Sequence, residues 1–107
     1  MTTNHTFGPW RKAAGIVSNP RVIVEDESGL TVCALSLRGA LGDINRMNAR
    51  ADLISAAPEL LEACMAMIEW DDREQDHAVD FNARMELCRA AFDKARAAIS
   101  KAKGEQQ

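Results

Sequence analysis

The sequence has few of the residues from which metal and catalytic sites are usually built. Its two histidines, His5 and His77, lie at no metal-ligand spacing from a cysteine or from each other. The three cysteines, Cys33, Cys64 and Cys88, form no C-x-x-C pair, and their odd number disfavours a disulfide framework. No G-x-S-x-G, H-E-x-x-H or P-loop motif is present. The sequence therefore predicts no metal, no cofactor and no enzymatic activity, with reduced cysteines packed as small core residues.

The chain also lacks a long apolar run and an excess of positive charge. No stretch approaches the roughly 18 apolar residues of a membrane span, and the first ten residues do not resemble a signal peptide. The formal net charge is -3, whereas proteins that bind duplex nucleic acid usually present a basic face. We therefore expect a cytoplasmic protein with neither a membrane nor duplex nucleic acid as a partner.

The composition that remains is that of one folded domain. Hydrophobic residues are 47% and charged residues 27% of the 107, a ratio typical of globular rather than disordered chains. A chain this short buries a modest core, and self-association is one way to bury more surface. We expect a single domain over residues 1–107. Its expected parts are an extended arm (1–9), a β-sheet (10–37), a helical hairpin (43–101) and a disordered tail (102–107).

The N-terminal third carries the β signal. Residues 21–25 are a β-branched run, R-V-I-V-E, and residues 30–37 alternate partly in polarity. The polar connector between them ends in Gly29, so the pattern predicts a β-hairpin. Trp10 opens a further short strand that runs to Ala14, which makes the sheet either a hairpin or a three-strand meander. Such a small sheet needs helices against one face.

The remaining residues have helical periodicity. Asp43 is a suitable N-cap for a first helix, because its carboxylate can accept backbone N–H groups of the first turn. The stretch 51–63, A-D-L-I-S-A-A-P-E-L-L-E-A, has apolar residues at helical spacing and contains Pro58. Proline lacks an N–H and clashes with the preceding turn. Either one kinked helix or two helices, the second beginning near Pro58, would fit.

A last helix is expected from Val79 to Lys101, after an acidic reversal at residues 70–77. Its apolar residues are spaced 4-3-4-3-4, as in a coiled-coil stripe: Phe81, Met85, Cys88, Phe92, Ala95 and Ile99. We expect this stripe to pack on Ile54, Leu61 and Ile68, with Cys64 and Cys88 buried. The predicted class is therefore α+β, with a small N-terminal antiparallel β-sheet followed by a C-terminal antiparallel α-helical hairpin.

Four polar residues near the start of the first helix are the candidate binding site: Arg38, Arg46, Asn48 and Arg50. Arginine matches phosphate oxygens in a two-pronged geometry, and a helix N-terminus adds backbone donors. Trp10 could stack on a base. The alternative is a solvated helix face with surface ion pairs. The acidic residues near the reversal (Glu69, Asp71, Asp72, Glu74, Asp76) lack a calcium-loop pattern and are expected to be solvated.

Two motifs resemble a family of small proteins found in bacteriophage and prophage genomes. Residues 5–10, H-T-F-G-P-W, resemble its H-T-x-G-P-W opening, and residues 51–63 resemble its A-x-L-I-x-A-A-P-E-L-L-E-A signature. The motifs stand in the family's order, with the predicted hairpin between them. One departure concerns the residue before Ala51, which is often Asn in the family and is Arg50 here, with Asn48 two positions earlier.

The expected layout is also similar to that of the Thoeris anti-defence sponges, which are oligomers that sequester cyclic nucleotide immune signals without degrading them. By this analogy the chain is a non-enzymatic, homo-oligomeric phage protein in the host cytoplasm. Arg46, Asn48, Arg50, Arg38 and Trp10 would then hold a cyclic nucleotide. The alternative is a protein-interaction module that inhibits a host defence protein through an acidic surface.

Overall fold

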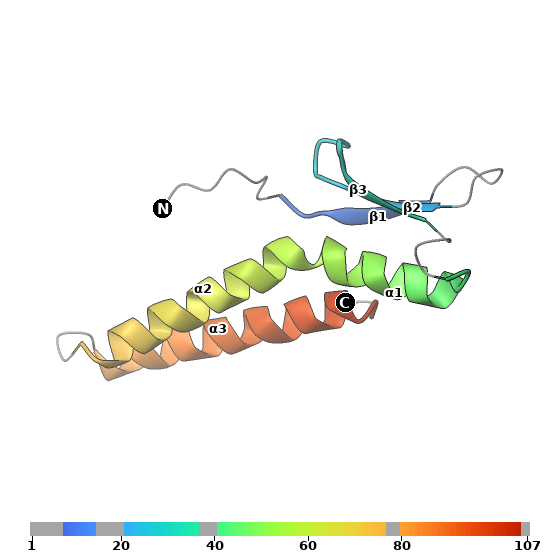
Figure 1. Cartoon of the computed structure of the whole chain (residues 1–107). Helices are drawn as coiled ribbons and strands as arrows, with labels where there is room; N and C mark the ends of the chain where they lie inside the picture. Colours follow the sequence, from blue (N-terminus) through green and yellow to red (C-terminus); the bar gives the residue numbers. More distant parts are fainter. Residues whose placement is uncertain (1–7, 15–20, 37–40, 77–79, 106–107) are drawn as a thin grey trace.

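The computed structural model describes residues 8–14, 21–36, 41–76 and 80–105, and it places a small sheet over one end of a helical hairpin (Figure 1). Three strands precede three helices. The strands are β1 (Arg11–Ala14), β2 (Arg21–Glu25) and β3 (Thr31–Ser36), and the helices are α1 (Ile44–Ser55), α2 (Ala57–Glu74) and α3 (Phe81–Ala102). The α+β class predicted from the sequence is confirmed.

The sheet is an antiparallel meander in the order β1-β2-β3. The three-strand arrangement is therefore the correct one of the two that the sequence left open. Arg11 lies opposite Glu25 and Ala14 lies opposite Val22 in the β1–β2 register. Side chains alternate along a strand, so Val22 and Val24 lie on one face of β2, where both are buried. This face is the one that meets the helices.

The turn between β2 and β3 is held by the carboxylate of Asp26. Its Oδ1 accepts hydrogen bonds from the backbone N–H of Ser28 at 3.0 Å, the Ser28 hydroxyl at 2.7 Å and the N–H of Leu30 at 2.9 Å. The Ser28 hydroxyl is the main cause of a lowered Asp26 pKa; burial opposes it, and the backbone donors reinforce it. Gly29 has a φ of 88°, which glycine adopts without strain.

The hydrophobic core is small and lies between the sheet and α1. Val22, Val24, Met47 and Ala51 are buried together. Four partly buried side chains pack against this cluster: Trp10, Cys33, Leu35 and Ile54. Val24 is the largest fully buried side chain of the described residues. The core is thus thin, as surface-to-volume scaling dictates for a short chain.

Around Pro58 the chain forms two separate helices rather than one kinked helix. α1 begins after Asp43, whose Oδ1 accepts from the backbone N–H of Arg46 at 3.2 Å, so the predicted cap is confirmed. The helix ends at Ser55, and α2 starts with Pro58 in its first turn. Proline has no N–H to donate to the carbonyl four residues earlier, but the first turn of a helix does not need one. A bend between α1 and α2 follows (Figure 1).

The helical hairpin of α2 and α3 is present, but the prediction of which helix faces pack against each other is wrong. The side chains buried between the two helices include Ala63, Ala91 and Ala98. The large apolar residues expected there are exposed instead: Leu61, Ile68, Phe81, Met85, Phe92 and Ile99. Alanine rows let two helix axes approach closely. The large side chains point about a quarter-turn away from the contact or further.

Two boundary predictions also need correction. Residues 70–74 belong to α2 and not to the reversal, because Trp70 packs on Phe92 with ring centroids 6.1 Å apart. Glu74 then pairs with Arg84 of α3 at 3.1 Å. Cys64 is exposed rather than buried, since it stands a quarter-turn from Ala63, and Cys88 is half-buried. The expected start of the last helix, residue 79, lies outside the described residues; α3 begins at Phe81.

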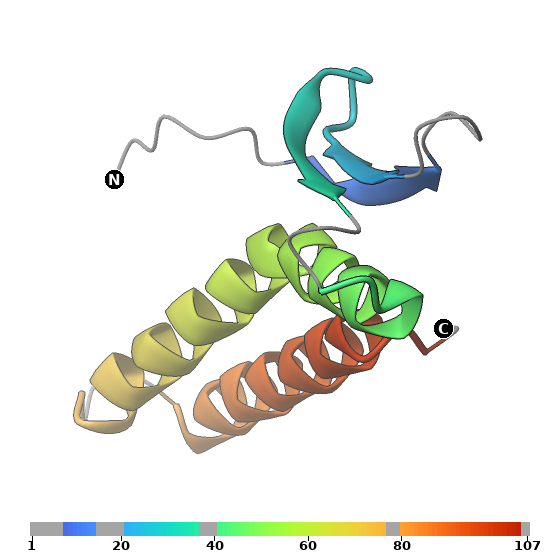
Figure 2. The ribbon, with the colours of Figure 1, turned by 45° about the vertical axis from the view of Figure 1, so that its right-hand side comes forward.

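The molecule is elongated, with its core near one end. Its extents are 60 × 26 × 21 Å, and its radius of gyration is 17.3 Å, against about 13 Å for a compact chain of this length. Figure 2 shows the sheet over α1, the C-terminal end of α3 beside α1, and the far end of the hairpin extending away from the sheet. No helix in the described part is long and apolar enough to cross a membrane.

Candidate functional site

Arg46 and Arg50 lie together on the exposed surface of α1. Residues four apart on a helix are neighbours, so both guanidinium groups project from one side of α1. The first-turn amide of Arg46 is already taken by Asp43. The positive charge for an anionic ligand would come from the two guanidinium groups, because the Arg46 amide is not available. This pair is the part of the predicted site that the structure brings together.

Asn48 lies on the opposite side of α1 from Arg46 and Arg50. Two residues along a helix correspond to a rotation of about 200°. The Asn48 side-chain amide donates to the carbonyl of Ile44 at 3.0 Å. One turn further along the same side, Asp52 pairs with Lys12 at 2.9 Å. Asn48 therefore stands on the side of α1 that β1 covers, apart from the arginine pair.

Trp10 is a partly buried residue at the other end of α1. Its side chain packs against the core cluster, and its indole Nε1 is buried with no hydrogen-bond partner among the described residues. Its carbonyl accepts from Lys101 Nζ, which also contacts Glu59. Glu59 follows Arg46 by almost four helical turns, on the order of 15–20 Å. Arg38, the remaining predicted site residue, lies outside the described residues, as do both histidines.

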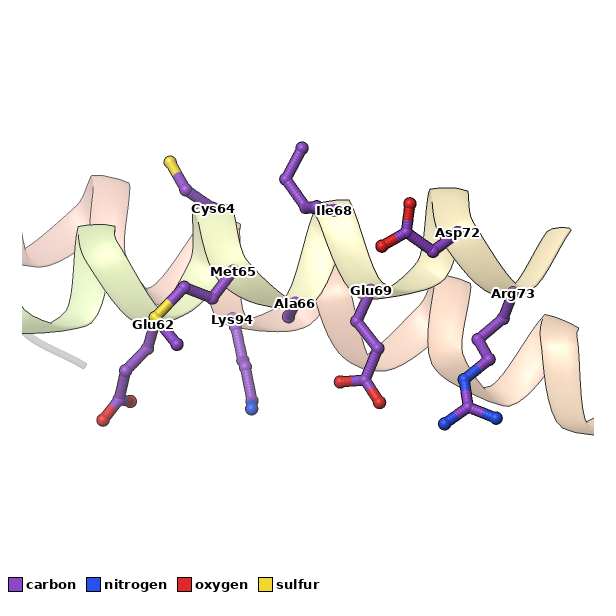
Figure 3. A pocket seen from close by; sticks show the side chains of 9 residues that line it. All are labelled: Glu62, Cys64, Met65, Ala66, Ile68, Glu69, Asp72, Arg73 and Lys94. Carbon is purple, nitrogen blue, oxygen red and sulfur yellow. The ribbon is translucent and has the colours of Figure 1, made fainter. Parts of the chain in front are cut away.

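A shallow groove of about 900 Å³ runs along α2 beside α3. Figure 3 shows the charged side chains Glu62, Glu69, Arg73 and Lys94 pointing to one side of the hairpin, while Cys64 and Ile68 point to the other. The groove lining includes three carboxylates, Glu62, Glu69 and Asp72, against two cations, Arg73 and Lys94. Its charge balance favours an anionic ligand less than the arginine pair of α1 does.

The acidic residues expected near the reversal are exposed on the last turns of α2 and just beyond it: Glu69, Asp71, Asp72, Glu74 and Asp76. No cluster of three or more potential ligands that could hold a metal ion occurs within the described ranges. Glu74 is engaged by Arg84. The cluster therefore forms an acidic surface at the hairpin end farthest from the core.

Sequence reasoning missed a bridge made by Lys101. Its Nζ lies 2.9 Å from the Trp10 carbonyl and 2.7 Å from Glu59 Oε1. One ammonium group thus joins the residue before β1, the first turn of α2 and the last turn of α3. The partners are 91 and 42 positions away in the sequence, and no local pattern connects such distant residues.

The chain is a small α+β protein in which a three-strand meander packs on α1, the helix that leads into the α2–α3 hairpin. The chain matches the family model described as Salmonella phage P22 protein Y8K6 over residues 1–106, and it belongs to that family of phage proteins. The prediction of a phage protein family is confirmed. No curated protein and no solved structure matches the chain.

Proposed function

We propose that this phage protein counters host defence by binding and sequestering a cyclic nucleotide signal without degrading it. The observation that carries the proposal is the pair Arg46 and Arg50, exposed one turn apart on the same side of α1. Two guanidinium groups at this spacing suit the phosphates of a cyclic nucleotide, since arginine binds phosphate oxygens through parallel hydrogen bonds. The anti-defence role is inferred from the phage family and from the resemblance to the Thoeris sponges.

The proposed site is narrower than the one that the sequence suggested. Asn48 donates to the Ile44 carbonyl on the far side of α1, and Trp10 packs into the core. Neither side chain is therefore part of the phosphate-binding surface that we propose. Recognition would depend on phosphate contacts made by Arg46 and Arg50, and base recognition would need groups outside this pair.

A thermal-shift titration against cyclic di- and trinucleotides and cyclic ADP-ribose isomers tests the proposal. A ligand present at about a hundredfold over its dissociation constant adds roughly 2.7 kcal/mol to the stability of the folded state. On a domain of this size, that raises the melting temperature by about 10 °C or more. Chromatography of the ligand after release from heat-denatured protein should recover it chemically unchanged, as sequestration requires.

The matched variants are R46A/R50A and a control, R73A/K94A, which removes the same charge from the groove. We expect the first variant to lose the thermal shift and the second to keep it. A shift that survives R46A/R50A would refute the assigned site. A flat response of the wild-type protein to the whole panel would refute the nucleotide ligand.

The second candidate is inhibition of a host defence protein through the acidic end of the hairpin. The specific observation is the exposure of Asp71, Asp72 and Asp76 around the end of α2. Charge of one sign on a projecting surface attracts a basic partner and speeds association. Affinity capture from host lysate, with D71K/D72K as the control bait, tests this role. Capture of the same proteins by both baits would contradict an acidic docking surface.

A further inference from the structure

The contact between α2 and α3 leaves several large apolar side chains of the hairpin mostly exposed. Ala63, Ala91 and Ala98 are buried in the contact. Ile68, Phe81, Met85, Phe92 and Ile99 are between 42% and 63% exposed. These five residues are called the apolar flank. A stripe with coiled-coil spacing normally packs along a whole helix, yet here Phe92 meets Trp70 of α2 only at its edge and stays 42% exposed.

The apolar flank lies on the opposite side of the hairpin from four charged side chains of the groove (Figure 3). In Figure 3, Ile68 points away from Glu62, Glu69, Arg73 and Lys94. Phe92 precedes Lys94 by two residues, which rotates it about 200° around α3 to the side of Ile68. Helix periodicity places Phe81, Met85 and Ile99 on the same side as Phe92. The apolar side carries two arginines at its edges, since Arg84 lies 5.8 Å from the Phe81 ring centroid and Arg96 lies 6.0 Å from that of Phe92.

The exposed apolar surface is as large as the largest patches of monomeric proteins and supplies most of one side of a small interface. A large apolar side chain has on the order of 150–250 Å² of surface. Five such residues, about half exposed, contribute roughly 400–600 Å² per copy. A standard interface buries about 800 Å² per partner, while the largest patch of a typical monomer is about 300–600 Å². The thin core makes the burial of this surface more important for stability.

The spacing of the stripe is the same when read from either end of α3. Its order 4-3-4-3-4 is centred on Ala90, so an antiparallel copy places Phe81 level with Ile99 of that copy and Met85 level with its Ala95. Each larger side chain then meets a smaller one, as close packing requires. A two-fold axis relates such copies, because each surface must complement itself.

The same axis passes close to Ile68. Glu59 pairs with Lys101, and Glu74 with Arg84, so the middle of α2 lies level with the middle of α3. Ile68 therefore stands beside the centre of the stripe. We propose that a second copy of this chain covers the apolar flank, with the two α3 helices antiparallel, to form a four-helix bundle around a two-fold axis. This inference does not depend on the nucleotide ligand.

Sedimentation equilibrium of the wild-type protein without any nucleotide is the first test. We expect a dimer at about 50 µM chain. The variant I68K/F81K should be monomeric, with the dimer dissociation constant raised by about 100-fold or more, because the two lysines at position 68 would meet near the axis and each lysine at position 81 would face the apolar Ile99 of the other copy. The control L30K/L41K changes two equally exposed leucines elsewhere and should stay dimeric, and circular dichroism checks that both variants are folded. A monomeric wild type, or a dimeric I68K/F81K, would overturn the proposal.

Oxidative cross-linking tests the direction of the helices. In a background of C33A/C64A/C88A, the variant M85C/A95C should form a covalent dimer, because each cysteine faces the other one across the axis. These positions are about 15 Å apart within one helix, too far for a disulfide in a single chain. In the control E86C/K94C, the two cysteines are also placed symmetrically about Ala90. They lie on the other side of α3, so this variant should not cross-link. Equal cross-linking of both, or of M85C alone, would refute the antiparallel arrangement.

Discussion

Replacing Lys101 by methionine tests whether one side chain fastens the sheet to the helical hairpin. Lys101 Nζ lies 2.9 Å from the carbonyl of Trp10 and 2.7 Å from Glu59 Oε1. Methionine keeps much of the apolar stem but has no donor. Both acceptors would lose their partner, and Glu59 would stay partly buried without its counter-charge.

The expected loss follows from the burial of the pair. A hydrogen bond to a charged group is worth about 1.5–3 kcal/mol, and loss of one partner leaves the other desolvated. The side chains of Lys101 and Glu59 are 28% and 31% exposed, so water partly screens their attraction. We expect K101M to lower the free energy of unfolding by about 1–2 kcal/mol. The melting temperature should fall by about 4–8 °C for each kcal/mol.

Urea and thermal denaturation followed by circular dichroism measure this loss. Both are done at one protein concentration, because self-association would make stability depend on it. The control is K103M, since Lys103 and Glu105 form a mostly exposed pair at 3.3 Å that should contribute little. A double-mutant cycle with E59Q isolates the ion pair from the contact with Trp10. Equal losses in K101M and K103M would refute the bridging role.

Two further predictions concern the turn and the core. The pKa of Asp26 is lowered on folding, so its charged form stabilises the protein above about pH 4, and this contribution is lost as the pH falls through the folded pKa. D26N should flatten the low-pH arm of melting temperature against pH, and an unchanged arm would contradict the role of the Ser28 hydrogen bonds. Met47 is 4% exposed within the core, so M47A should cost about 2–5 kcal/mol in urea denaturation. A loss below about 1 kcal/mol would mean that the cavity collapses.

The parts of the fold that could be predicted from the sequence depend on neighbours in the chain. The β-branched run of β2, the connector ending in Gly29 and the cap at Asp43 each act within a few residues. Pro58 could be placed near a helix start, although choosing two helices over one required the structure. The same holds for Arg46 and Arg50, whose spacing of four residues places them together on any helix.

The parts that could not be predicted depend on which face of each helix packs against its neighbour. The large apolar stripe of α3 and the alanines Ala91 and Ala98 follow the same helical period, so periodicity alone does not select the face that meets α2. Alanine at heptad spacing beside a stripe of large residues was the available signal. Asn48 was grouped with the arginines by proximity in sequence, whereas helix rotation separates them.

The placement of the core at one end of a 60 Å molecule gives the two ends different local stabilities. At one end, α1 packs on the sheet around Val24 and Met47, and Lys101 of α3 contacts the carbonyl of Trp10. Further out, the contacts between the two helices include the buried Ala63 and Ala91, the Trp70–Phe92 ring pair and the Glu74–Arg84 ion pair. Backbone amides there should exchange with deuterium through brief local openings, while amides of β2 should exchange only on global unfolding. A molecule that binds the outer half of the hairpin would therefore slow amide exchange in that half alone.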